Sequence, residues 1–210
     1  GRPRSSSPQI KEADNPGHAA IGSLFLLWAW ASAGIGCSTS AEDAASRITC
    51  LLVASGTSFF GSLCASQARF GTIQWSSVAL APLAGLLSCL PVASTVTVQT
   101  SAVLGIVGAL AATCCEHLLR TAGLDDLGGT ASAHAGGAIA GLVASPMLAA
   151  SPSLPILGLH FCVALGCASA SFLGGLILWG ALGLLVRRFP SEDEAGIGLD
   201  FTEHGWKRGP

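Results

Sequence analysis

The chain has 210 residues, of which 50% are hydrophobic and only 10% are charged, and its formal net charge is -2. Soluble domains carry roughly a quarter of charged residues, so this composition excludes a water-exposed surface around the whole chain. Ten scattered Lys and Arg residues without interleaved aromatic residues also exclude a basic surface for nucleic acid. The composition therefore predicts a membrane protein, with the lipid bilayer as its partner.

Residues 1–17 (GRPRSSSPQIKEADNPG) are polar and predict a flexible tail or a loop between two helices. Apolar runs then predict an all-α membrane domain over residues 18–187, a bundle of about six transmembrane helices, followed by a tail at 188–210. Glu42, Asp43, Arg69, Asp125 and Asp126 mark the gaps between these runs. The last run is too long for an untilted crossing, so we expect a loop at Pro152 and Pro155 or an extension past the membrane. The predicted spans are 18–39, 48–67, 76–94, 98–119, 131–150 and 156–186.

The distribution of positive charge predicts the orientation. With six spans, nine of the ten Lys and Arg residues fall on one side, and only Arg47 falls on the other. Cytoplasmic loops are enriched in Lys and Arg, so both termini are predicted to be cytoplasmic. The nine residues are Arg2, Arg4, Lys11, Arg69, Arg120, Arg187, Arg188, Lys207 and Arg208.

Small residues fill the predicted spans. Gly136, Gly137 and Gly141, and the pair Gly174 and Gly175, are expected where helices approach each other closely. The eight cysteines form no C-x-x-C pair and have no His at ligand spacing, so we interpret them as small packing residues and not as disulfides or a metal site. They are Cys37, Cys50, Cys64, Cys89, Cys114, Cys115, Cys162 and Cys167.

Ionisable residues inside a span are costly and need an explanation. Asp126 precedes His134 by eight residues, a little over two turns, so a continuous helix would place both near one face, with Asp126 capping its start. A neutral imidazole can both donate and accept a hydrogen bond, which suits a narrow pore for a small polar solute. The alternative is a structural His bonded to a neighbouring carbonyl. We interpret His160 and His117 as interfacial or packing residues.

Around these positions the sequence resembles the ammonium transporter and Rhesus protein family. DDLGGTASAHAGGAIAG resembles the segment in which an Asp is followed eight residues later by a pore His and glycines. PGHAAIGSLFLLWAWASAGIGCS, RITCLLVASGTSFFGSL and APLAGLLSCLPVAS are similar to the family's sixth, seventh and eighth spans. SEDEAGIGLDFTEHG resembles the cytoplasmic tail of the ammonium transporter branch. Residues 16–206 thus resemble spans six to eleven, the second half of the eleven-helix fold.

This resemblance implies an ammonium or ammonia transporter with no cofactor, and not an enzyme. It also implies a homotrimer with one pore per subunit, in the plasma membrane. His134 corresponds to one of the two pore histidines, Asp126 to the Asp before it, and Trp30 to a pore-wall aromatic residue. Cys37 aligns with a vestibule Ser and is adjacent to Ser38. The family's Gly-Phe-Asn after the Trp is Ser32-Ala33-Gly34 here.

Three interpretations remain from the sequence. The first is a family transporter seen as a truncated form, because the matches to the first five spans are absent. The second is a non-conducting remnant or regulatory subunit that assembles with full-length transporters. The third, an intramembrane serine protease using Ser55 and His134, is disfavoured because Val53 and Ala54 do not provide the G-x-S-G context.

Overall fold

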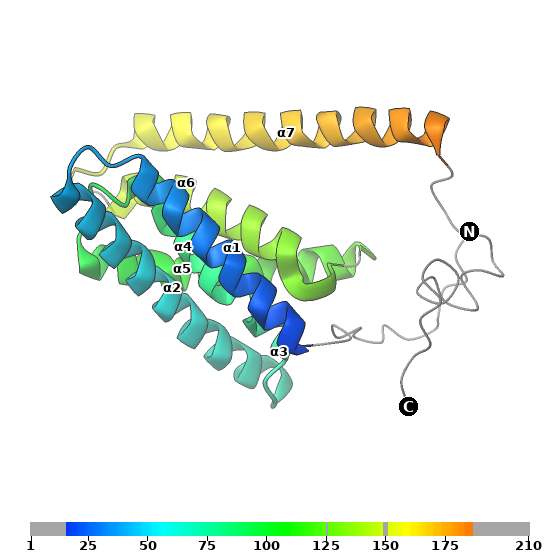
Figure 1. The fold of residues 1–210 in the computed structure, drawn as a ribbon, viewed down its shortest axis with the longest axis horizontal. Helices are drawn as coiled ribbons and strands as arrows, with labels where there is room; N and C mark the ends of the chain where they lie inside the picture. The colour runs from blue at the N-terminus through cyan, green and yellow to red at the C-terminus, as the bar shows by residue number, and fades with distance from the viewer. Residues whose placement is uncertain (1–15, 125, 149–150, 187–210) are drawn as a thin grey trace. The chain divides into compact units, whose positions relative to one another are not determined.

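The computed structural model describes residues 16–124, 126–148 and 151–186. Within these ranges all regular structure is helical, which confirms the all-α prediction, and the helices follow the six predicted runs (Figure 1). The chain divides into two units, residues 1–164 and 165–210. The predicted tail at 188–210, most of the polar start at 1–17 and Asp125 lie outside the described residues.

Among the described residues, four helices are long and apolar enough to cross a membrane, so the chain is a multi-pass membrane protein. Their outward surfaces carry large apolar side chains, such as Phe25 and Trp28 on α1, which are 73% and 74% exposed. Lipid is the solvent that suits such a surface. The four helices are α1 (Pro16–Gly36), α2 (Ala41–Phe70), α5 (Val98–Thr121) and α7 (Leu154–Leu185).

Helix α2 is longer than predicted at both ends. Ser40 caps its first turn, where the Ser40 hydroxyl accepts the Asp43 N–H at 3.1 Å. Asp43 also accepts a hydrogen bond from Arg47 Nε at 3.0 Å. Two predictions are therefore wrong: the start of this span at residue 48, and the assignment of Glu42, Asp43 and Arg69 to gaps between spans. Acidic residues in the first turn complement the helix dipole, so charge here strengthens a helix end and does not mark a loop.

The third apolar run is interrupted. It forms α3 (Trp75–Val78), α4 (Ala81–Cys89) and the short η1 (Leu90–Val92) instead of one continuous span. Pro82 and Pro91 lie at the beginnings of α4 and η1. Proline has no N–H to donate to the carbonyl four residues earlier, so each new helical segment begins near its proline.

The fifth run is also interrupted, so the condition of a continuous helix from Asp126 to His134 is not met. The segment begins with η2 (Leu127–Gly129), followed by a wide π turn, η3 (Ser132–Gly136), and then α6 (Gly137–Leu148). Gly128 and Gly129 have φ values of 81° and 71°, in the left-handed region that glycine enters at low cost. The chain therefore turns sharply between Asp126 and the helix that holds His134.

Small residues allow α2, α4 and α5 to pack closely. A Cβ on Gly85 or Gly105 would clash with the backbone of Ala54, and one on Gly108 would lie 2.6 Å from the Ala84 carbonyl. Serine hydroxyls add hydrogen bonds between the helices, from Ser58 to the Ala81 carbonyl (2.6 Å) and from Ser88 to the Leu104 carbonyl (2.7 Å). Tight backbone contact and such hydrogen bonds are what stabilise helix packing in lipid.

The predicted close approach at Gly136, Gly137 and Gly141 is confirmed. Gly136 faces the backbone of Ala111 and Ala112 on α5, whereas Gly137 and Gly141 face Ala84 and Ser88 on α4. Gly174 and Gly175 lie in the second unit, residues 165–210, and the close approach expected there stays a prediction. All eight cysteines are free thiols, but only Cys50 and Cys89 are fully buried.

Candidate functional site

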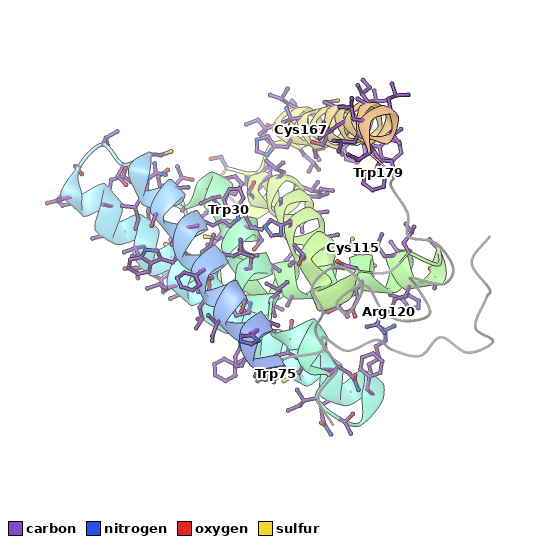
Figure 2. The ribbon with its side chains drawn as sticks, turned by 45° about the vertical axis from the view of Figure 1, so that its right-hand side comes forward. Trp30, Trp75, Cys115, Arg120, Cys167 and Trp179 are labelled. Atoms are coloured by element: carbon purple, nitrogen blue, oxygen red, sulfur yellow. The ribbon has the colours of Figure 1, made fainter. Side chains whose placement is uncertain are left out.

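Trp30 and His134, which are 104 residues apart in the sequence, lie next to each other. The indole Nε1–H of Trp30 donates a hydrogen bond to His134 Nε2 at 3.3 Å, and the ring centroids are 6.1 Å apart at an interplanar angle of 59°. Both side chains are half-buried. Figure 2 marks Trp30 on α1, whose inward side also packs against the core shared by α2 and α4. The structure therefore brings together two of the residues that the sequence singled out.

The position of His134 follows from the glycines beside it. His134 lies in the π turn between Ser132 and Gly136, where the backbone is wider than in an α-helix. Gly136 and Gly137 then press the segment against α5 and α4, and a side chain at either position would meet backbone atoms. The imidazole is thus held on a segment fixed on two sides, facing α1.

The hydrogen bonds of His134 define its protonation state. Its Nδ1 is 2.9 Å from the Thr130 carbonyl oxygen, which can only accept a hydrogen bond. The Trp30 indole can only donate, so His134 Nε2 must carry the lone pair. Both contacts are satisfied by one species, the neutral imidazole protonated at Nδ1. A neutral ring avoids the cost of placing a charge inside the membrane.

Asp126 holds the start of the segment that carries His134. Its carboxylate accepts the N–H groups of Ala131 (3.0 Å) and Ser132 (2.8 Å) and also the Ser132 hydroxyl. These N–H groups belong to the first helical turn and have no partner within the helix. Asp126 therefore caps the start of this helical segment, as the sequence predicted. A turn at Gly128 and Gly129, and not a continuous helix, connects Asp126 to the capped residues.

Cys37 and Ser38 lie at the end of α1, away from this contact. Cys37 is seven residues after Trp30, about 10 Å along the helix axis. Cys37 is exposed, and the Ser38 hydroxyl is buried without a hydrogen-bond partner among the described residues. The described structure shows no hydrogen bond from Cys37 or Ser38 to Trp30 or His134, so the predicted vestibule role of both residues stays a prediction.

Two other histidines, His160 and His117, have structural partners. His160 Nδ1 is 2.6 Å from the Leu142 carbonyl oxygen, and His117 Nδ1 accepts a hydrogen bond from Arg69 at 2.9 Å. Ser55 has a buried hydroxyl with no hydrogen-bond partner in the described chain, and the two nitrogens of His134 bond to Trp30 and Thr130. The geometry therefore does not support a serine nucleophile activated by His134.

Sequence reasoning missed Glu116. Its side chain is buried on α5 and forms an ion pair with Arg120, one turn further along the same helix and labelled in Figure 2. The available signal was a carboxylate inside an otherwise apolar run, four residues before an Arg. The sequence was interpreted only at the neighbouring His117, as an interfacial or packing residue.

Comparison with known proteins identifies the family. A sequence model described as the Ammonium Transporter Family matches residues 1–208. The chain belongs to the ammonium transporter family. The match covers nearly the whole chain, in agreement with the resemblance seen in the helix of His134 and in the other spans. No curated protein matches the chain.

Solved structures show the same fold. A protein described as a sensor Amt protein is similar with a TM-score of 0.75 and 24% identity, over 91% of this chain and 50% of that one. Mep2 from Candida albicans is similar with a TM-score of 0.74 and 23% identity, over 86% of this chain and 44% of that one. The chain thus spans about half the length of the solved chains it matches.

Proposed function

We propose that this chain serves the transmembrane movement of ammonium or ammonia, and that it corresponds to spans six to eleven of the family fold. The single observation that carries the site assignment is the hydrogen bond between Trp30 and His134. It joins the two residues that the family resemblance assigns to the pore wall, although they come from helices far apart in the sequence. Family membership supports the substrate class.

The chemistry of the site suits this substrate. An ammonium ion that enters an apolar constriction loses its hydration, which costs far more free energy than moving neutral ammonia. A neutral imidazole has a lone pair at Nε2. This lone pair can accept a hydrogen bond from the solute when the hydrogen bond from Trp30 Nε1–H is broken. Asp126 would act indirectly, because its carboxylate fixes the helix start that positions the imidazole.

The remaining assignments follow from the family. We propose a homotrimer in the plasma membrane, with both termini in the cytoplasm. The orientation is supported by the Lys and Arg asymmetry of the sequence. In this orientation the end of α1 with Cys37 and Ser38 lies on the outer side, where the family resemblance places a vestibule, and Asp126 lies on the inner side.

A second candidate function is a non-conducting or regulatory subunit that assembles with longer family members. It is favoured by one observation, that the chain spans only about half of the solved chains it matches. Secondary transporters of this kind often place the pathway between two repeats, so one half would require a partner to complete a pore.

Uptake measurements separate these functions. The chain would be expressed alone, and together with a full-length family member, in cells that lack ammonium uptake, and [14C]methylammonium uptake would be measured. Uptake by the chain alone that is lost in His134→Ala would support conduction. No uptake alone, combined with altered uptake by the full-length partner, would support the regulatory function. Both functions are refuted if the chain alone gives no more uptake than cells without it, and if co-expression leaves the uptake of the full-length family member unchanged. His117→Ala is the matched control, because His117 bonds to Arg69 and not to Trp30.

A further inference from the structure

Gly34 lies about one helical turn beyond Trp30, on the side of α1 that faces the core. Among the α1 residues whose burial the structure describes, only Ala31 and Gly34 are buried, and Trp30 packs against the core beside them. Residues three and four apart share one face of a helix. Trp30, Ala31 and Gly34 therefore belong to the surface through which α1 contacts α2 and α4 (Figure 1).

Two leucines from different elements enclose Gly34. A Cβ at Gly34 would lie 2.8 Å from Leu90 Cδ1 on η1 and 2.9 Å from Leu51 Cδ1 on α2. Carbon atoms pack at about 3.5–4.0 Å, so a methyl group has no room between the two leucine side chains as they stand. Leu51 is 0% exposed, and its close-packed neighbours restrict its rotation. The absence of a side chain at Gly34 therefore allows α1 to lie this close to α2 and η1.

The helix α1 is the element that can move if position 34 gains a side chain. Its outward side carries exposed apolar side chains, such as Phe25 and Trp28, and the lipid that suits them can rearrange around a shifted helix. Leu51, in contrast, belongs to the buried core cluster. Bringing the new methyl group to an ordinary contact distance from Leu90 and Leu51 requires a shift of about 1 Å. We therefore expect α1 to move outward by about this distance.

The hydrogen bond between Trp30 and His134 is sensitive to such a shift. Its length of 3.3 Å is already at the long end for an N–H donor, so a further ~1 Å would break it. His134 would not follow α1, because Gly136 and Gly137 pack its segment against α5 and α4. We propose that Gly34 is a positioning residue, whose lack of a side chain sets the distance at which α1 presents Trp30 to His134. Its role in transport rests on the proposed function, whereas its effect on this contact can be measured without transport.

Nuclear magnetic resonance of the purified chain in detergent, with 15N-labelled Trp and His side chains, tests this role. In the wild type, we expect a scalar coupling between Trp30 Nε1 and His134 Nε2 across the hydrogen bond. Gly34→Ala should abolish this coupling and move the His134 Nε2 resonance to its position in Trp30→Phe, which lacks the donor. Gly22→Ala and Gly36→Ala are matched controls on α1, because a Cβ at either position meets no atom within 4 Å, and both should keep the coupling.

A rescue variant and an uptake measurement complete the test. Leu51→Ala and Leu90→Ala together remove both atoms that the new methyl group would meet, so adding them to Gly34→Ala should restore the coupling, also where Gly34→Ala alone does not fold. Methylammonium uptake should fall in Gly34→Ala and not in Gly22→Ala. If the coupling is lost as expected but uptake is unchanged, the proposed function fails and the positioning role stands. The positioning role is overturned if Gly34→Ala keeps the coupling, if a control variant loses it equally, or if the rescue variant does not restore it.

Discussion

The His160 side chain replaces a hydrogen bond that α6 cannot make for itself. Pro146 lies inside α6 and has no N–H, so the Leu142 carbonyl four residues earlier loses its helical donor. His160 Nδ1 is 2.6 Å from that carbonyl oxygen and, since the carbonyl can only accept, the imidazole donates the bond. We predict that His160→Leu destabilises the protein because it leaves the Leu142 carbonyl without this donor.

The expected magnitude follows from the single bond that is lost. An orphaned buried acceptor costs about 1–3 kcal/mol, whereas interhelical hydrogen bonds measured in membrane proteins average about 0.6 kcal/mol. We therefore expect His160→Leu to lower the free energy of unfolding by about 1 kcal/mol. In a Pro146→Ala background residue 146 can donate its own N–H to Leu142, so the same change should cost much less.

Unfolding of the purified chain by SDS in mild detergent measures all four members of this double-mutant cycle. His160→Asn, which retains a side-chain donor, is the conservative variant and should lose less stability than His160→Leu. Equal effects of His160→Leu in the wild-type and Pro146→Ala backgrounds would show that His160 acts through packing alone and would refute the reasoning.

Three further predictions use the same unfolding measurement. Trp30→Phe removes the donor to His134 but keeps an aromatic ring, so it should lower the free energy of unfolding by about 1 kcal/mol. It should also shift the His134 Nε2 resonance in a 15N spectrum, and an unchanged resonance would contradict the hydrogen bond. Asp126→Ala loses its contacts to Ala131 and Ser132 and should cost about 1–2 kcal/mol, whereas Asp126→Asn should retain part of them. Gly141→Ala should be strongly destabilising because its methyl group would clash with Ser88, whereas Gly22→Ala on α1, where the methyl group meets nothing, should be neutral or slightly stabilising.

The sequence was sufficient to predict the helical segments, because apolar length directly reflects the thickness of the bilayer. The prediction of helix bounds failed where proline, glycine or a helix cap determines where a helix begins or ends. Pro82 and the two glycines at positions 128 and 129 interrupt runs that look continuous by hydropathy. The cap at Ser40 extends α2 through residues that look too charged for a span. The close packing of Gly137 and Gly141 was predictable because residues four apart lie on one side of a helix, whereas Gly136 packs against a different helix, α5.

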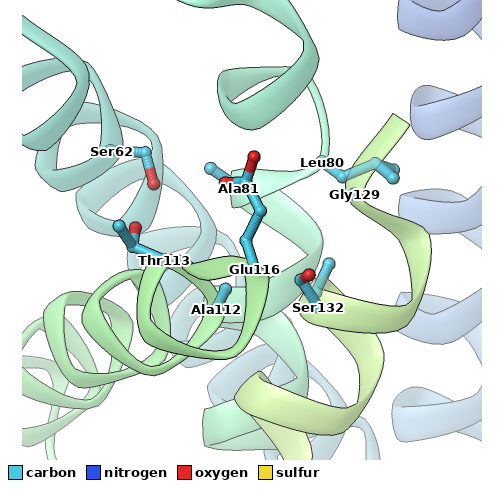
Figure 3. A pocket seen from close by; sticks show the side chains of 9 residues that line it. Ser62, Leu80, Ala81, Ala112, Thr113, Glu116, Gly129 and Ser132 are labelled. Atoms are coloured by element: carbon cyan, nitrogen blue, oxygen red, sulfur yellow. The ribbon is translucent and has the colours of Figure 1, made fainter. Parts of the chain in front are cut away.

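The site was only partly predictable, for a different reason. Spacing within one segment indicated Asp126 and His134, but the contact between His134 and Trp30 depends on how α1 packs against the fifth segment, which no local pattern encodes. Trp30 was found through the family resemblance. Figure 3 shows a small pocket that was missed, because its polar residues Ser62, Glu116 and Ser132 come from α2, α5 and η3 and each alone looks like an ordinary polar residue in a span.

The hydrogen bonds of His134 connect its fold to its proposed use. The Thr130 carbonyl accepts the hydrogen bond of His134 Nδ1. If the neighbour of Nε2 were hydrophobic, the lone pair of Nε2 would have no donor, which costs free energy. Trp30 removes that penalty with a weak, 3.3 Å hydrogen bond from a side chain on a different helix. Such a bond can be exchanged for one from a small solute at little net cost, whereas the Thr130 bond keeps the ring neutral and oriented. Under the proposed function, the same contact would provide both a stable resting site and a binding position for a small solute.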